Sequence, residues 1–74
     1  MYIAAHWKVF DRTGAEIDAI EHELHLISGT NVYRTETVND DRTYDAIYVL
    51  KGNVTGERLA DACDFMENSG AYPV

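Results

Sequence analysis

The spacing of apolar residues divides the chain into segments of alternating and of helical periodicity. Residues 2–10 alternate, which is typical of a strand that buries one face. The face that we expect to be buried carries Ile3, Ala5, Trp7 and Val9, and the other carries Tyr2, Ala4, His6, Lys8 and Phe10. From Ala15 the apolar residues recur at helical spacing, at Ile17, Ile20, Leu24 and Ile27.

Turn and capping residues set the two ends of this first helix. Residues 11–14 are turn formers, among which Asp11 or Thr13 can serve as the helix N-cap. Ser28 and Gly29 provide the C-terminal stop, because glycine readily adopts the left-handed conformation. The sequence therefore predicts a helix over residues 14–28.

The second half of the chain contains two further strands and a second helix. Residues 31–38 and 43–51 are rich in β-branched and aromatic side chains, and the polar cluster at 39–42 is typical of a hairpin turn. A second amphipathic helix is predicted over residues 55–69, and the tail 71–74 is either a docked end or an edge strand. The apolar stripe of this helix holds Leu59, Ala62, Cys63 and Met66, with Phe65 at its flank.

The resulting β-α-β-β-α order predicts an α+β fold, which we expect to form a single small domain over residues 1–74. A right-handed crossover between the first two strands, with the third strand antiparallel, favours the sheet order 1-3-2. Both helices then cover one face of a three-stranded antiparallel sheet and make a two-layer sandwich. The topology resembles the ferredoxin-like fold without a full last strand. Many unrelated functions share that fold, so it implies no activity.

The chain of 74 residues is acidic, with 13 Asp+Glu against 6 Lys+Arg and a formal net charge of −7. This excess argues against nucleic acid or an anionic membrane as a direct partner, because both bind basic surfaces. The sequence shows neither a transmembrane stretch nor a signal-peptide pattern. The single cysteine, Cys63, cannot form an internal disulfide. We therefore expect a cytoplasmic protein, located in the host cytoplasm if it is viral.

The negative charge is concentrated in the two predicted helices. Residues 14–28 carry four acidic residues and no Lys or Arg, residues 55–69 carry four acidic residues and one arginine, and the rest of the chain is neutral. Such a surface attracts a basic groove on another protein, although acidic helix faces also serve solubility alone. The candidate partner-binding carboxylates are Glu16, Asp18, Glu23, Asp61 and Asp64.

The face of the sheet away from the helices is a second candidate surface. A hairpin loop of two or four residues centred on Asp40 and Asp41 pairs Tyr33 with Tyr48 and Thr37 with Tyr44. Val32, Val38, Ile47 and Val49 then pack under the helices, and the open face presents Tyr33, Tyr44, Tyr48, Thr35, Thr37 and His6. Tyrosines are enriched at protein interfaces, although an open sheet face is also commonly solvated.

The predicted register has one unfavourable feature, since it sets Glu36 opposite Asp45. Like charges directly opposite each other destabilise a sheet, and only Arg34 is near enough in sequence to relieve this pair. A hairpin loop one residue longer or shorter would flip the faces.

No motif in the sequence predicts catalysis. His22 and His25 are three residues apart, whereas the helical zinc-protease motif needs its histidines four apart, and no further ligand follows from the spacing. Cys63 lies on the apolar stripe and is interpreted as a small core residue. We expect no enzymatic activity, no cofactor and no bound metal.

Composition and size therefore favour a protein-binding module. The chain resembles, in class and composition, the small acidic proteins that phages encode against host defences, of which anti-CRISPR proteins are the best-known example. The resemblance implies an inhibitor or decoy that occupies the basic, nucleic-acid-binding surface of a partner protein. The alternative is a ferredoxin-like small-molecule-binding or regulatory domain that acts as a homodimer. A third hypothesis is a metal-dependent enzyme that uses His22 and His25.

Overall fold

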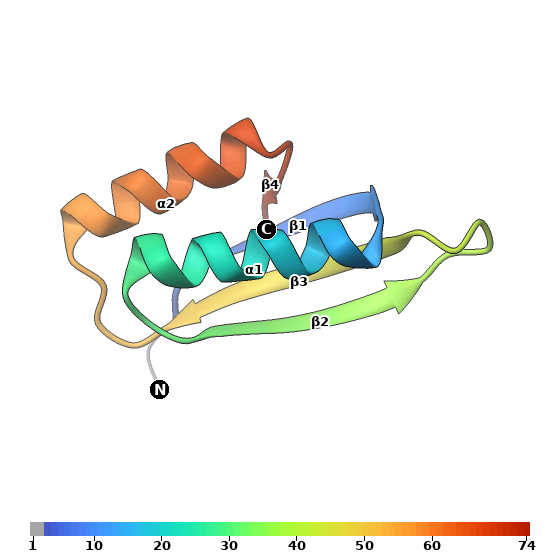
Figure 1. Ribbon diagram of the computed structural model, residues 1–74. Helices are drawn as coiled ribbons and strands as arrows, with labels where there is room; N and C mark the ends of the chain where they lie inside the picture. Colours follow the sequence, from blue (N-terminus) through green and yellow to red (C-terminus); the bar gives the residue numbers. More distant parts are fainter. Residues whose placement is uncertain (1–2) are drawn as a thin grey trace.

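The computed structural model describes residues 3–74, and the elements follow the predicted order with one addition at the C-terminus (Figure 1). Tyr2 lies outside the described residues, as do the side chains of Ile3 and Ala4. The elements are β1 (Ile3–Arg12), α1 (Gly14–Ser28), β2 (Val32–Val38), β3 (Tyr44–Lys51), α2 (Gly56–Asn68) and β4 (Tyr72–Pro73). The bounds of α1 coincide with the predicted ones.

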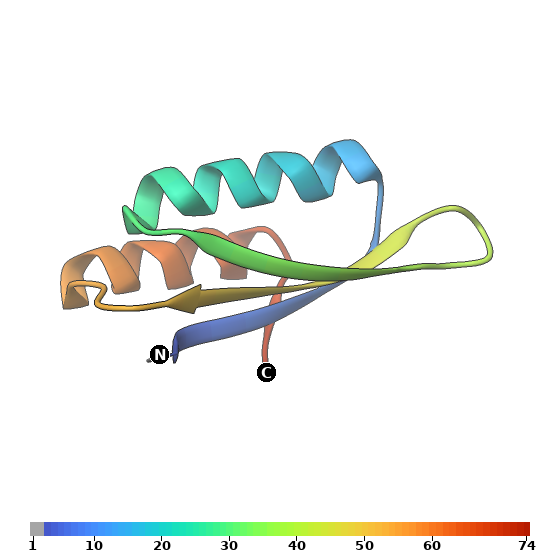
Figure 2. The same ribbon diagram turned by 90° about the horizontal axis from the view of Figure 1, so that it is seen from below.

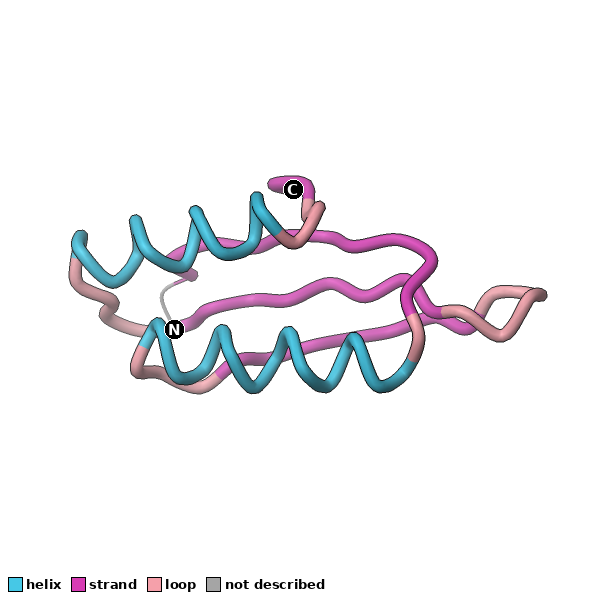
Figure 3. The backbone as a smooth tube through the Cα atoms, turned by 45° about the horizontal axis from the view of Figure 1, so that its top comes forward, coloured by secondary structure: helices cyan, strands magenta, loops and turns pink. Residues whose placement is uncertain are grey.

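The strands form one antiparallel sheet in the order β2-β3-β1-β4. This confirms the predicted 1-3-2 arrangement and adds the two-residue β4, which pairs Trp7 with Pro73 and Lys8 with Tyr72. The order is that of a ferredoxin-like sheet with a shortened last strand. Both helices lie on the same face, with α1 nearer β2 and α2 nearer β1 and the C-terminus (Figure 3).

The hairpin between β2 and β3 closes through a loop of odd length. Asn39 donates its backbone N–H to the carbonyl of Thr43, and Arg42 donates to the carbonyl of Asn39 while its own φ is 67°. A type I turn followed by a left-handed residue has this pattern and leaves three residues in the loop. The predicted loop of two or four residues was therefore wrong.

This loop shifts the strand register by one residue and exchanges which side chains face the helices. Tyr33 pairs with Val49 and Arg34 with Tyr48, so Tyr44 and Tyr48 point to the helix side while Ile47 and Val49 point to the open face. The prediction placed all four on the opposite faces. The predicted clash is also gone, because Glu36 pairs with Ala46 and Thr37 with Asp45.

The core lies between the sheet and the two helices. Tyr48 is fully buried at 0% exposure, and its hydroxyl donates a 2.8 Å hydrogen bond to the Ile17 carbonyl. The predicted stripe of α1 is confirmed, because Ile17, Ile20 and Leu24 are buried and Ile27 packs against them. The buried apolar residues are Trp7, Val9, Ile17, Ile20, Leu24, Ala46, Tyr48, Leu50, Ala62, Met66 and Ala71.

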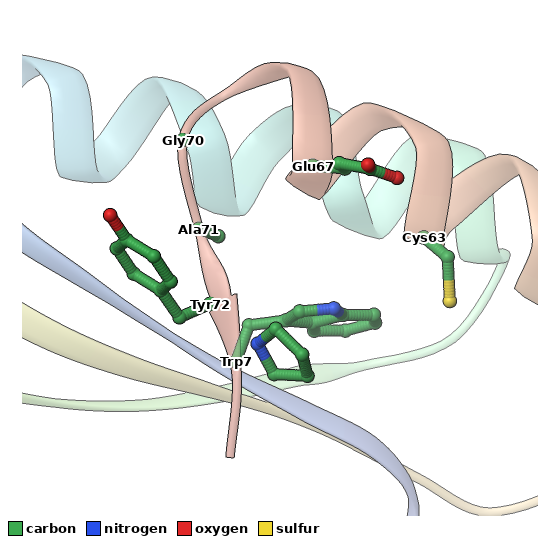
Figure 4. A pocket seen from close by; sticks show the side chains of 7 residues that line it. Trp7, Cys63, Glu67, Gly70, Ala71 and Tyr72 are labelled. Atoms are coloured by element: carbon green, nitrogen blue, oxygen red, sulfur yellow. The ribbon is translucent and has the colours of Figure 1, made fainter.

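Helix α2 buries less of its predicted stripe than α1 does. Ala62 and Met66 are fully buried and Leu59 is half-buried, but Cys63 is exposed. The expectation that Cys63 is a core residue was wrong. The side chain lies on the flank of α2 that faces the short β4, where no long strand covers it (Figure 4).

Capping interactions fix the ends of the helices. The Thr13 hydroxyl accepts a hydrogen bond from the Glu16 backbone while the Glu16 carboxylate accepts one from Thr13, which forms a complete capping box. At the other end of α1, Gly29 has a φ of 70°, and a side chain there would collide with the Arg58 guanidinium. The left-handed backbone conformation favours glycine at this position, whereas the Arg58 guanidinium is the mobile end of a long side chain and can move aside.

Candidate functional site

The outer surfaces of the two helices form one candidate site, which we call the acidic helix layer. Its exposed carboxylates are Glu16 and Glu23 on α1 and Glu57, Asp61, Asp64 and Glu67 on α2. The predicted positions Glu16, Glu23, Asp61 and Asp64 are thus all exposed on these helices. Because both helices cover the same face of the sheet, these charges share one side of the molecule (Figure 1).

Glu16 differs from its neighbours because it also has a structural role. The hydrogen bonds from the backbone N–H and the hydroxyl of Thr13 lower the pKa of Glu16. An acidic side chain in the first turn also complements the helix dipole. Glu16 is therefore both part of the acidic helix layer and part of the cap that begins α1.

Asp18 is engaged within the fold and does not belong to the free part of the layer. Arg34 on β2 lies 2.7 Å from Asp18 and 3.0 Å from Glu21 on α1, and 3.7 Å from Glu36 on its own strand. The hydrogen bond to Asp18 raises the pKa of Arg34, so this guanidinium stays charged at all accessible pH. The cluster fastens α1 to the edge of the sheet.

The remaining arginines near the helices bind backbone or lie at helix ends. Arg12 donates a 2.6 Å hydrogen bond to the Ser69 carbonyl at the C-terminus of α2, and Arg58 lies against Gly29 at the C-terminus of α1. Cations are stabilising at these ends because the helix dipole is negative there. Within residues 3–74, all the ion pairs belong to Arg34, so the six carboxylates of the acidic helix layer form none, and only Glu16 has its pKa lowered by a nearby cation, Arg12.

The open face of the sheet has the opposite character. It carries both lysines of the chain, with the Lys51 ammonium 4.6 Å from the centre of the Tyr33 ring and the Lys8 ammonium 4.9 Å from that of Phe10. The Phe10 ring in turn contacts Tyr72 edge-on, with 5.9 Å between centroids. Of the three predicted tyrosines, the structure leaves only Tyr33 on this face.

Two exposed aromatic residues of this face were missed by the sequence analysis. Phe10 was assigned to the correct side of its strand but was not considered as a surface residue, and it is 43% exposed. Tyr72 is 63% exposed and reaches this face through the pairing of β4 with β1. The tail was too short to predict its pairing, so no sequence signal identified Tyr72.

A groove of about 550 Å³ separates α2 from the edge of the sheet. Figure 4 shows the Cys63 sulfur pointing toward the Trp7 indole, while the Tyr72 ring lies on the other side of β4. Glu67, Ala71 and Pro73 also line this groove. Its walls are mostly apolar, and it exists because β4 covers only two residues of β1.

His22 and His25 do not come together with further metal ligands. The Nδ1 atom of His25 lies 2.8 Å from the Thr30 carbonyl and donates to it, which ties this ring to the end of α1. Among residues 3–74 there is no group of three or more His, Cys, Asp or Glu side chains arranged to hold a metal ion. In the same part of the chain, neither helix has the length and apolar character needed to cross a membrane.

Comparisons of this chain with protein-family models, with curated proteins and with solved structures found no match to any of them. The fold and the two surfaces above are therefore the basis for any functional inference.

Proposed function

We propose that the protein is a non-catalytic binding module whose acidic helix layer docks on a basic surface of a partner protein. The observation that carries this proposal is the segregation of charge: six exposed carboxylates on the helices form no ion pair within the described residues, and both lysines lie on the other side of the sheet. A partner that normally binds nucleic acid offers the complementary surface, so the module acts as a decoy or inhibitor.

Long-range attraction favours the helix layer over the open sheet face for such a partner. Charges on one face add their fields, which raises the rate of encounter with an oppositely charged groove. The lysines on the sheet face, Lys8 and Lys51, repel the same groove. A cationic partner therefore approaches this molecule from its helix side.

The test is a capture experiment with two matched baits in a bacterial lysate. The wild-type chain is expected to retain a nucleic-acid-binding protein, and the triple variant Glu23→Lys, Asp61→Lys, Asp64→Lys is expected to lose it. Glu16 stays unchanged because its substitution would break the capping box of α1. Added DNA or RNA should displace the captured protein, and raised salt should slow its association more than it speeds its dissociation.

A control variant separates the two surfaces. Tyr33→Ser with Tyr72→Ser alters the open sheet face and leaves the helices intact. Capture that survives the charge reversals but is lost in this control would place the partner on the sheet and contradict the proposal. A captured protein that binds the module and nucleic acid at the same time would contradict the decoy mechanism.

A further inference from the structure

The edge of the sheet formed by β2 is a regular, uncovered strand. β2 lies at the margin of the sheet, and no strand within residues 3–74 lies beyond it (Figure 1), whereas the other edge is partly covered by β4. Pairing with β3 runs from Val32 to Val38 without a register shift, so the edge has no bulge. It also has no proline, and bulges and prolines are two of the devices that block an edge from further pairing. Charged side chains are another such device, and the two on this strand, Arg34 and Glu36, have opposite signs.

The register determines which backbone groups of β2 are free. Asn39 bonds to Thr43 across the hairpin, and bonded pairs alternate along an antiparallel ladder, so Thr37, Thr35 and Tyr33 also bond to β3. The backbone groups of the residues between them therefore point away from the sheet. These free residues are Val32, Arg34, Glu36 and Val38.

The sequence of this edge is complementary to itself. Read from Val32 to Val38 it is VYRTETV, and an antiparallel copy centred on Thr35 places Arg34 opposite Glu36 of the second chain. The same register places Val32 opposite Val38, which is 67% exposed in the single chain. Both pairs join residues whose backbone groups are free, so the ladder bonds can form in this register.

We propose that two copies of this chain form a symmetric dimer by pairing their β2 strands antiparallel about Thr35, which joins the two sheets into one. The two-fold symmetry makes each favourable pair occur twice, as an isologous interface requires. Opposite charges facing each other across strands stabilise the pairing, and the free edge groups supply the main-chain hydrogen bonds. The proposal concerns the sheet edge and is independent of the acidic helix layer.

Disulfide trapping tests the register directly. Two residues at the two-fold axis of a non-bonded pair have Cα atoms about 4.5 Å apart, which is within disulfide range. We expect Thr35→Cys, made with Cys63→Ser, to form a covalent dimer under mild oxidation. The control Thr37→Cys, also with Cys63→Ser, places its two thiols about 13 Å apart, since four residues at about 3.3 Å separate them.

The expected result is that Thr35→Cys crosslinks about tenfold faster than the control, because pairing raises the effective concentration of its thiols. Equal rates for the two variants would overturn the proposal. The two positions are both exposed on the open face of the same strand, so the comparison holds folding and accessibility constant.

Charge exchange provides a second and independent test. Glu36→Arg sets Arg34 against a second arginine and should weaken dimerisation by about tenfold in sedimentation velocity. Glu23→Arg makes the same change in charge away from this edge and should leave dimerisation unchanged. A wild-type chain that sediments as a monomer at every concentration up to the millimolar range would contradict the proposal.

Discussion

The two helices cover the same sheet but are held to it in different ways. α1 sinks the large side chains of Ile17 and Leu24 fully into the core, receives the Tyr48 hydroxyl at its backbone, and is fastened along its flank by Arg34. α2 fully buries only Ala62 and Met66, and a groove separates its Cys63 flank from the sheet edge. Figure 2 shows both helices lying along the sheet, and they differ in the side chains that each buries.

This difference indicates that stability is distributed unevenly. A region with several large buried side chains and satisfied polar anchors opens at a cost close to that of global unfolding, whereas a region with fewer of them opens more easily. We therefore expect α1, β1 and β3 to form the stable part of the molecule. α2 and β4 are expected to be the part that adjusts when a partner binds.

The largest expected effect is on the α1 side of the core. Leu24→Ala removes a fully buried side chain and should lower the free energy of unfolding by about 2–5 kcal/mol, which approaches the whole stability of a domain of this size. Urea denaturation measures it. The control Leu26→Ala, at a position that is 57% exposed on the same helix, should change stability by less than about 0.5 kcal/mol. Equal effects would mean that the buried face of α1 is wrongly assigned.

A second prediction concerns how the stability of the α1 side of the core changes with pH. Burial raises the pKa of Tyr48 to about 12 from 10.0, because the folded state favours the neutral hydroxyl. The part of the free energy of unfolding that comes from this preference is fully present below pH 10 and is lost as the pH rises toward 12. The loss should be about 2–3 kcal/mol, because each pKa unit corresponds to about 1.4 kcal/mol.

The control for this prediction is Tyr48→Phe, which cannot ionise. At pH 8 it should be less stable than the wild type by about 0.5–1.5 kcal/mol, the usual contribution of one hydrogen bond. Above pH 10 the difference should shrink and reverse. An unchanged difference across this range, measured by urea denaturation at each pH, would show that Tyr48 does not ionise with unfolding.

The smallest effect compares the two N-caps. Thr13 takes part in a complete capping box, whereas Thr55 accepts one bond from Arg58 without a reciprocal partner. Thr13→Ala should cost about 1–2 kcal/mol and Thr55→Ala about 0.5–1 kcal/mol. Because the pKa of Glu16 is lowered in the folded state, the extra contribution of the Thr13 cap should fade as the pH falls through that pKa. A larger loss for Thr55→Ala would contradict the order of the two caps.

The elements and their order were predictable from the sequence because their signals are local. The stripe from Ile17 to Ile27, the cap at Thr13 and the stop at Gly29 each act within a few residues, and α1 was located correctly at both ends. β1 runs further than predicted, to Arg12, because Asp11 takes a left-handed φ of 56° at a register shift and lets the strand continue.

The register of the hairpin was not predictable from composition alone. A left-handed conformation at Arg42 is uncommon for this residue type, so the sequence did not indicate a loop of three residues. The unfavourable pairing of Glu36 with Asp45 was the signal that the predicted register was wrong. In the observed register, two of the three candidate tyrosines, Tyr44 and Tyr48, lie on the helix side of the sheet and not on its open face.

Some of the candidate site residues could be placed from local sequence patterns, and others could not. The exposed carboxylates at Glu23, Asp61 and Asp64 followed from helix periodicity, and the structure places them as expected. The ion pair of Asp18 with Arg34 and the exposure of Cys63 both depend on how distant elements pack together. No local sequence pattern contains that information.

The groove between Trp7 and Cys63 has a consequence for how the molecule can be observed. The chain has one indole and one thiol, and they line the same groove from different elements, β1 and α2. A nearby thiol quenches indole fluorescence, and the Cys63 sulfur points toward Trp7 (Figure 4), so the emission of this protein reports on the position of α2. Any event that lifts α2 from the sheet should brighten the emission before the rest of the molecule changes, and Cys63→Ser should remove that signal.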